Sequence, residues 1–342
     1  MPEKPYKVCN TCGREFWTEQ DFLKSTTRWR MCERGNLWFN CGCNSTNMII
    51  KGKFPWYSPD MFMSGEAKSV FNTLPSLQDL PHLPTSVMEL QQLILDDKVS
   101  SAKLAQVSKK DPLIATNILK IANNLKAGST QAIESLEHAI SYIGLNSLSD
   151  IILTASIKAF PFKTENFKSD TFWSESFLTG RIAEQLSRKF APNLVHDEVY
   201  LAGALCNVGK VVLAICFPTD ADKIDRDSKD PKKLTSWRTG EQIHDTQDHC
   251  ILGEIAASFW GLPEYIMNSA AYHHRPPETA GVKTDPDITD VVRLANQLSH
   301  WIQLEPNKIE QELLIQSAQL FGLSEGDLDG IAEEFMTLRQ AS

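Results

Sequence analysis

Apolar residues recur at helical spacing over most of this chain, and this period constrains the fold more than any other feature of the sequence. From about Pro84 onward the apolar positions follow the repeat of an amphipathic helix, as in the stripe formed by Val87, Leu90 and Ile94. Few stretches alternate with the period of two that a half-buried strand requires. The main body is therefore predicted to be an all-α, multi-helix domain.

Capping signals predict several helix boundaries. Asp111 precedes a proline, a pair typical of a helix N-terminus. Ser135 is expected to open a helix that Gly144 closes in a left-handed conformation, and Asn146 is expected to cap the next helix. Further helices are expected over 169–190, 198–217 and 249–260.

The N-terminal region is rich in cysteine. Five of the eight cysteines of the chain fall within its first 43 residues: Cys9, Cys12, Cys32, Cys41 and Cys43. In a reducing cytosol such clusters more often bind metal than form disulfides. A C-x-x-C turn places two thiolates on one side of a tight knuckle, and a second pair from a distant hairpin would complete a tetrahedron around Zn²⁺.

We predict a structural zinc site with Cys9, Cys12, Cys41 and Cys43 as ligands and Cys32 as the alternate for Cys43. So small a module cannot bury enough apolar surface to fold alone, whereas zinc binding contributes on the order of 10 kcal/mol or more. The alternative is that these thiols bind no metal and are redox-active. The remaining cysteines, Cys206, Cys216 and Cys250, are expected to be small buried apolar residues.

The formal charge is unevenly distributed along the chain. The net charge is −9, but residues 1–53 carry +4 and the remainder therefore carries −13. An acidic body argues against wrapping nucleic acid, because phosphates repel it. This objection does not apply to the basic head, residues 1–53. Its Trp29 and Trp38, interleaved with Arg28 and Arg30, could stack bases. The alternative is that the aromatic residues form the core of the head and the arginines its solvated rim.

Several segments of the helical body match one family in order and spacing. The segments are LPTSVMELQQLILDD at 83–97, KKDPLIATNILKIANN at 109–124, SLEHAISYIGLNSLSDIIL at 135–153, FWSES at 172–176, HDEVYLAGALCNVGK at 196–210, DHCILGEIAASFWGLP at 248–263 and AYHHRP at 271–276. Together they resemble the HDOD domain, the bacterial output-domain relative of the HD metal-dependent phosphohydrolases. The resemblance covers roughly residues 70–300 and implies an all-helical, HD-like fold and a role in signal transduction.

The resemblance also implies where the metal ligands of an HD enzyme would stand. Such enzymes use a helical histidine, a paired His–Asp, later histidines and a final aspartate. The matching positions here are Glu175, Cys206 with Asn207, then His249, His273 and His274, and finally Asn296. Because Mg²⁺ and Mn²⁺ prefer carboxylate oxygens, the neutral amide of Asn207 removes charge that catalysis requires. We predict a vestigial pocket without catalytic residues.

Two literal His–Asp pairs, at 196–197 and 244–245, do not align with the metal-binding pair. The surviving His249, His273 and His274 could hold zinc or iron without that pair, or could persist as hydrogen-bonded packing residues. The text after His274 is RPPETAG, so the GYP signature of the cyclic-dinucleotide phosphodiesterases is not matched.

The predicted organisation is a cysteine-rich zinc module at 1–53, a linker at 54–75, the HDOD helical domain at 76–300 and a helical tail at 301–342. No apolar run is expected to reach the length that spans a bilayer, and the N-terminus lacks the apolar core of a secretory signal. We therefore expect a cytoplasmic protein without membrane contact.

The sequence predicts a non-catalytic signalling or regulatory protein that acts by binding a protein partner, with a small ligand in the vestigial pocket as a further option. One alternative is a metal-dependent phosphohydrolase that uses the residual histidines. The other is a nucleic-acid-binding regulator that acts through the basic head.

Overall fold

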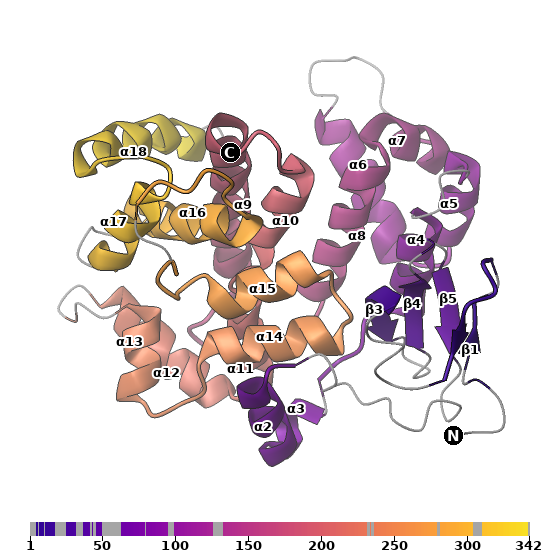
Figure 1. The fold of residues 1–342 in the computed structure, drawn as a ribbon, viewed down its shortest axis with the longest axis horizontal. Helices are drawn as coiled ribbons and strands as arrows, with labels where there is room; N and C mark the ends of the chain where they lie inside the picture. The colour runs from indigo at the N-terminus through magenta and orange to yellow at the C-terminus, as the bar shows by residue number, and fades with distance from the viewer. Residues whose placement is uncertain are drawn as a thin grey trace. The chain divides into compact units, whose positions relative to one another are not determined.

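A computed structural model gives the arrangement of most of the chain (Figure 1). It describes residues 5, 7–9, 11–17, 25–31, 37–41, 43, 46–49, 63–78, 80–94, 99–125, 133–230, 233, 236–278, 281–303 and 310–340. The chain divides into two compact units. The first comprises Met1–Met61, Pro81–Phe160 and Phe259–Leu262, and the second comprises Phe62–Leu80, Pro161–Ser258 and Pro263–Ser342. The boundaries predicted at residues 53, 75 and 300 remain predictions.

Short strands form the regular structure described in the cysteine-rich head. The strands are β1 (Lys7–Val8), β2 (Glu15–Phe16), β3 (Thr26–Met31), β4 (Leu37–Cys41) and β5 (Thr46–Ile49). β1 pairs antiparallel with β2, and β4 lies between β3 and β5 in a second antiparallel sheet. Phe16 is fully buried, as expected of an aromatic residue in the core of the head.

Helices make up the rest of the first unit. They are α4 (Thr85–Ile94), α5 (Ser101–Ser108), α6 (Pro112–Leu125), α7 (Leu136–Ile143) and α8 (Leu145–Lys158). Their apolar stripes meet in one cluster that includes the fully buried Val87, Leu90 and Ile118. The predicted N-cap at Asp111 is confirmed, since its Oδ1 accepts a hydrogen bond from the backbone N–H of Ile114 at 3.2 Å.

The turn between α7 and α8 corrects one predicted cap. Ser135 caps α7, and Gly144 ends it with φ +84°, a conformation that glycine adopts without strain. The prediction that Asn146 caps the next helix is wrong, because Asn146 lies inside α8. Gly144 reverses the chain in a single residue, and its carbonyl already accepts a hydrogen bond from Leu148 N at 3.1 Å.

All the regular secondary structure described in the second unit is helical. Its helices are α2 (Gly65–Thr73), α3 (Pro75–Gln78), α9 (Ser169–Phe190), α10 (His196–Leu205), α11 (Val208–Cys216), α12 (Pro218–Lys229), α13 (Trp237–Ile243), α14 (His249–Phe259), α15 (Glu264–Tyr272), α16 (Ile288–Gln303), α17 (Gln311–Gln319) and α18 (Glu325–Gln340). The core cluster joins α9, α10 and α16 through residues such as Ile182, Val199 and Leu298. The predicted HD-like, all-α body is confirmed.

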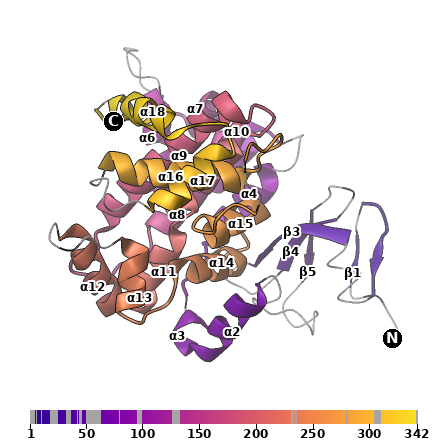
Figure 2. The same cartoon turned by 60° about the vertical axis from the view of Figure 1, so that its left-hand side comes forward.

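The C-terminal tail belongs to this core. α17 and α18 pack on α16 (Figure 2). Leu314 and Ala318 of α17, with Leu328 and Phe335 of α18, join the same buried cluster as α9 and α10. The tail therefore docks on its own chain.

A break separates α10 from α11, where the sequence predicted one helix over 198–217. Asn207 adopts φ −90° and ψ 13°, which interrupts the helical path between two apolar segments. The stretch His196–Cys216 is long and apolar enough to cross a membrane by composition, contrary to the expectation that no run is. Because 83% of its most apolar window is buried inside the protein, it is consistent with a core segment of a soluble protein.

Candidate functional site

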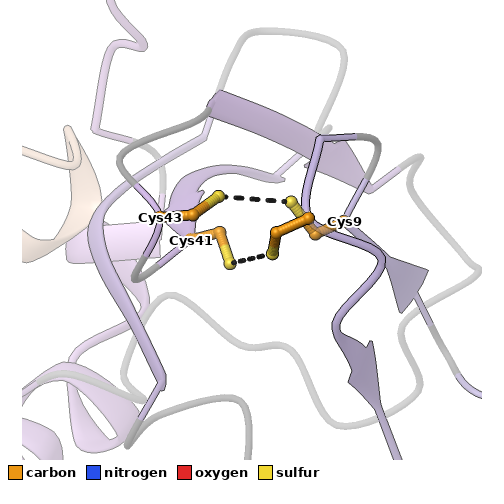
Figure 3. A group of neighbouring side chains, drawn as sticks. Cys9, Cys41 and Cys43 are labelled. Carbon is orange, nitrogen blue, oxygen red and sulfur yellow. Dashed lines mark hydrogen bonds between the residues drawn. The ribbon is translucent and has the colours of Figure 1, made fainter.

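Four cysteines of the head converge on one point. Cys9 and Cys43 place their Sγ atoms 3.7 Å apart, and Cys12 and Cys41 do the same (Figure 3). All four sulfurs lie within 4.8 Å of one another. The structure thus brings together the four predicted ligands, while the alternate, Cys32, lies outside the described residues.

Two turns hold these cysteines in place. Between β1 and β2, the backbone N–H of Gly13 donates to the carbonyl of Cys9 at 3.0 Å, and Gly13 has the positive φ (+71°) that this knuckle requires. Cys41 ends β4 and Cys43 follows in the turn to β5, so the second pair comes from a distant hairpin, as predicted.

The spacing of the sulfurs suits a tetrahedral zinc ion. A disulfide would need about 2.05 Å between sulfurs. Two sulfurs that each lie about 2.3 Å from zinc are about 3.8 Å apart across a tetrahedral angle, close to the observed distances. Burial raises the pKa of the Cys41 thiol to about 12. Because a bound metal cation deprotonates a coordinating thiol, Zn²⁺ would supply the positive charge that this cluster needs.

A second site lies in the helical body, at the break between α10 and α11. Asn207 Nδ2 donates to Asn296 Oδ1 at 2.8 Å and lies 3.4 Å from Cys206 Sγ. All three side chains are buried. The structure thus brings together three of the positions that the HD resemblance assigns to metal ligands, although they come from the break after α10 and from α16.

This part of the pocket holds little negative charge. Two amides replace two carboxylates, and burial raises the pKa of the Cys206 thiol to about 12, so the thiol is neutral at pH 7. Within the described part of the chain, Asn207 Oδ1 and Asn296 Nδ2 have no hydrogen-bond partner. The residues present therefore do not fit a hard divalent cation, which requires carboxylate oxygens.

Three histidines form the other part of the pocket. His249 begins α14, and His273 and His274 follow the end of α15; all three are buried. Each offers one ring nitrogen within 4.8 Å of the others. The Nε2 atoms of His249 and His273 lie only 3.4 Å apart.

Outer oxygen acceptors fix the tautomers of these rings. His249 Nδ1 lies 2.8 Å from Glu241 Oε1, and His274 Nδ1 lies 3.0 Å from Glu310 Oε2. His273 Nδ1 lies 3.0 Å from the carbonyl of Ser269. Because each Nδ1 faces an oxygen, it carries the proton and donates it. The lone pairs then reside on the Nε2 atoms.

The resulting nitrogen set fits a single transition-metal ion. Burial, with the neighbouring imidazoles, holds the pKa of His273 and His274 well below the usual range, so both are neutral ligands at pH 7. Two imidazole nitrogens that each lie about 2.05 Å from zinc are about 3.4 Å apart across a tetrahedral angle, which matches His249 and His273. Histidine ligands that donate their second N–H to a carboxylate or carbonyl are the rule in metal sites.

Lys210 of α11 connects the two parts of the pocket. It is buried, lies 5.0 Å from the ring centre of Trp237, and interacts electrostatically with Glu175 and Glu241. Burial lowers the pKa of Lys210 and raises that of Glu175. Glu175, at the helical histidine position, therefore faces a buried ammonium group.

The backbones of α11 and α14 meet beside this pocket. A Cβ atom added to Gly209 would lie 1.8 Å from the carbonyl oxygen of His249. Only glycine allows this approach, which sets His249 next to the break after Cys206 and Asn207.

The sequence did not identify Glu241, Glu310 or Lys210 as site residues. Lys210 stands in the LCNVGK segment, which could have drawn attention to it. Glu241 and Glu310 lie in polar stretches of sequence outside the family segments, and no local sequence signal identifies them as site residues.

The two literal His–Asp pairs lie apart from the pocket. His196 Nδ1 is 2.8 Å from the hydroxyl of Ser187, and His244 Nε2 is 2.9 Å from Asp227 Oδ2. Both histidines therefore have partners of their own.

Among the remaining cysteines, Cys206 and Cys250 are buried as predicted. Cys216, also expected to be buried, is only partly buried, and its thiol donates to the carbonyl of Ser76 at 3.4 Å.

Several proteins resemble this chain. An uncharacterised protein of Treponema pallidum (strain Nichols) is 23% identical over 204 residues, which are 59% of this chain and 39% of that protein. The chain thus spans well under half the length of this relative.

Among solved structures, an HDOD domain protein from Geobacter sulfurreducens has a TM-score of 0.59 at 22% identity, covering 79% of this chain and 92% of its own. A candidate phosphohydrolase from Shewanella amazonensis SB2B has a TM-score of 0.56 at 19% identity, covering 77% and 93%. A candidate signal transduction protein from Marinobacter aquaeolei VT8 has a TM-score of 0.57 at 15% identity, covering 88% and 73%.

These similarities establish the HD-like helical fold, and proteins that share it include both a candidate signal transduction protein and a candidate phosphohydrolase. Residues 80–276, more than half of the chain, match the HDOD domain. The chain therefore belongs to the HDOD domain family.

Proposed function

We propose that this protein is a non-catalytic, cytoplasmic component of bacterial signal transduction that acts by binding a protein partner through its helical domain. The observation that carries the proposal is the buried amide pair of Asn207 and Asn296, bonded at 2.8 Å where an HD enzyme would place two carboxylates. A buried amide pair joined by a hydrogen bond supports a packed helical scaffold. It does not supply the charge that holds a hard catalytic cation.

Phosphodiester hydrolysis by full-length protein with Mn²⁺ or Fe²⁺ tests this proposal. We expect no hydrolysis above background for the wild type. The comparison is the triple variant Cys206→His, Asn207→Asp, Asn296→Asp, which restores three of the four missing groups and leaves Glu175 at the helical histidine position. Hydrolysis by the wild type above background would contradict the proposal.

We further propose that the head holds one structural zinc ion through Cys9, Cys12, Cys41 and Cys43. The two sulfur pairs at 3.7 Å support this. Four thiolates leave no open coordination position for a water molecule, so such an ion would stabilise the module without catalysis. The module would then present a rigid surface to a partner.

A second candidate function is a metal-dependent phosphohydrolase that uses the residual histidines. The convergence of His249, His273 and His274 supports it, because three imidazoles with fixed tautomers can hold an ion without the lost His–Asp pair. Elemental analysis combined with a hydrolysis assay separates the candidates. A second metal per chain that is lost in His273→Ala, together with hydrolysis lost in the same variant, would favour the enzyme.

A further inference from the structure

Glu310 joins the C-terminal helical pair to the histidine pocket. It immediately precedes α17, and its Oε2 accepts the Nδ1 proton of His274 at 3.0 Å. Its backbone N–H donates to Oε1 of the fully buried Gln297 of α16 at 3.2 Å. Two hydrogen bonds thus fix the start of α17 to the pocket.

A cationic side chain from α13 lies near the same carboxylate. Arg238 Nη1 donates to the carbonyl of His274 at 3.1 Å and lies 4.0 Å from Glu310 Oε1. The Glu310 side chain is only 27% exposed. The bond between His274 and Glu310 is therefore shielded from water and sensitive to the charge on the imidazole.

Binding of a cation at Nε2 of His274 would strengthen this bond. A metal ion withdraws electron density from the ring, so the Nδ1–H becomes a stronger donor to the carboxylate. Thermodynamic linkage makes this effect reciprocal. If binding of the ion strengthens the docking of Glu310, then docking of Glu310 raises the affinity of the pocket for the ion by the same factor.

We propose that the three Nε2 atoms of His249, His273 and His274 take a single borderline cation such as Zn²⁺, and that Glu310 couples its binding to the docking of α17 and α18. This rests on the proposed signalling function and deepens it, since it names the ligand of the pocket and the element that responds. The centre needs neither Cys206 nor Asn207. The structural response to binding of the ion is tighter docking of the C-terminal helices α17 and α18.

Hydrogen exchange followed by mass spectrometry on the full chain tests the coupling. Zn²⁺ is added beyond the amount held by the cysteines of the head, and exchange is measured in peptides that cover α17. In the wild type we expect one further zinc per chain and slower exchange of the α17 amides. In Glu310→Gln we expect pocket affinity to fall about 10-fold or more. At saturating zinc the exchange of α17 should then no longer respond.

The matched control is Glu312→Gln, in the first turn of the same helix. Glu312 is exposed and accepts a hydrogen bond from Gln316 at 3.2 Å, on the helix surface. This variant should behave as the wild type does in both measurements.

Two results would overturn the proposal. One is the absence of a second zinc in the wild type, and the other is a second zinc that leaves α17 exchange unchanged. Neither result bears on the signalling function, which fails on wild-type phosphodiester hydrolysis instead.

Discussion

Single side chains decide what each of the two clusters can bind. Four sulfurs at tetrahedral spacing suit a borderline cation such as Zn²⁺. The buried amides of Asn207 and Asn296 carry no net charge and therefore attract a metal cation only weakly. The three imidazoles differ from both, because Glu241 and Glu310 hold two of the Nδ1 protons. The chemistry of each cluster thus follows from which atoms are ionised or protonated, and neighbouring residues set that state.

The zinc of the head gives a prediction at this scale. Replacing Cys9 and Cys12 by serine removes two thiolates, and we expect the head to lose its zinc and unfold, since zinc binding contributes about 10 kcal/mol or more to such modules. Elemental analysis should show a loss of about one zinc per chain. Cys216→Ser, outside the cluster, is the matched control and should keep it. Retention of zinc by the double variant would exclude this site.

At the level of elements, the close approach of α11 to α14 positions the pocket. Gly209 allows the backbone of α11 to reach the carbonyl of His249, while Gly253 of α14 lies against Ala270 of α15. α14 and α15 lie side by side in both views of the fold (Figures 1 and 2). Small residues at these contacts bring the histidines of two helices within reach of one another.

Gly209→Ala tests this contact. The added methyl group would meet backbone atoms that cannot rotate away, so we expect a loss of about 3 kcal/mol in stability. Urea unfolding followed by circular dichroism measures it. Gly330→Ala is the control, because Gly330 is exposed in α18 with no atom within 4 Å of the added group. There we expect a gain of about 0.5–1 kcal/mol from helix propensity. Equal effects of the two substitutions would refute the close approach.

At the level of the whole molecule, the half-buried His300 makes stability depend on pH. Burial, with the nearby Lys210, lowers the pKa of His300 to about 3, whereas an unfolded histidine titrates at about 6.5. The unfolded chain therefore binds the proton first. Stability is present above about pH 6.5 and is lost as the pH falls from there toward the folded pKa.

His300→Gln should remove this contribution. When the pH falls from about 7.5 to about 5.0, a single histidine of this kind lowers the free energy of unfolding of the wild type by about 2 kcal/mol. We expect the stability difference between variant and wild type to shift by that amount over the same range. Urea titrations of both proteins at the two pH values measure it, and parallel pH profiles would show that His300 does not contribute.

The sequence by itself predicted the helical body, and it identified the four cysteines that converge in the head and most of the positions that meet in the pocket. α9 begins and ends where the apolar period predicted, because this signal acts between residues within a few turns of one another. The residues of the vestigial pocket followed from the order of family segments. Only the tertiary structure decided the bond between Asn207 and Asn296, the break after α10, and the carboxylates of Glu241 and Glu310. Contacts between residues distant in the chain depend on how helices pack, and local sequence does not encode that geometry.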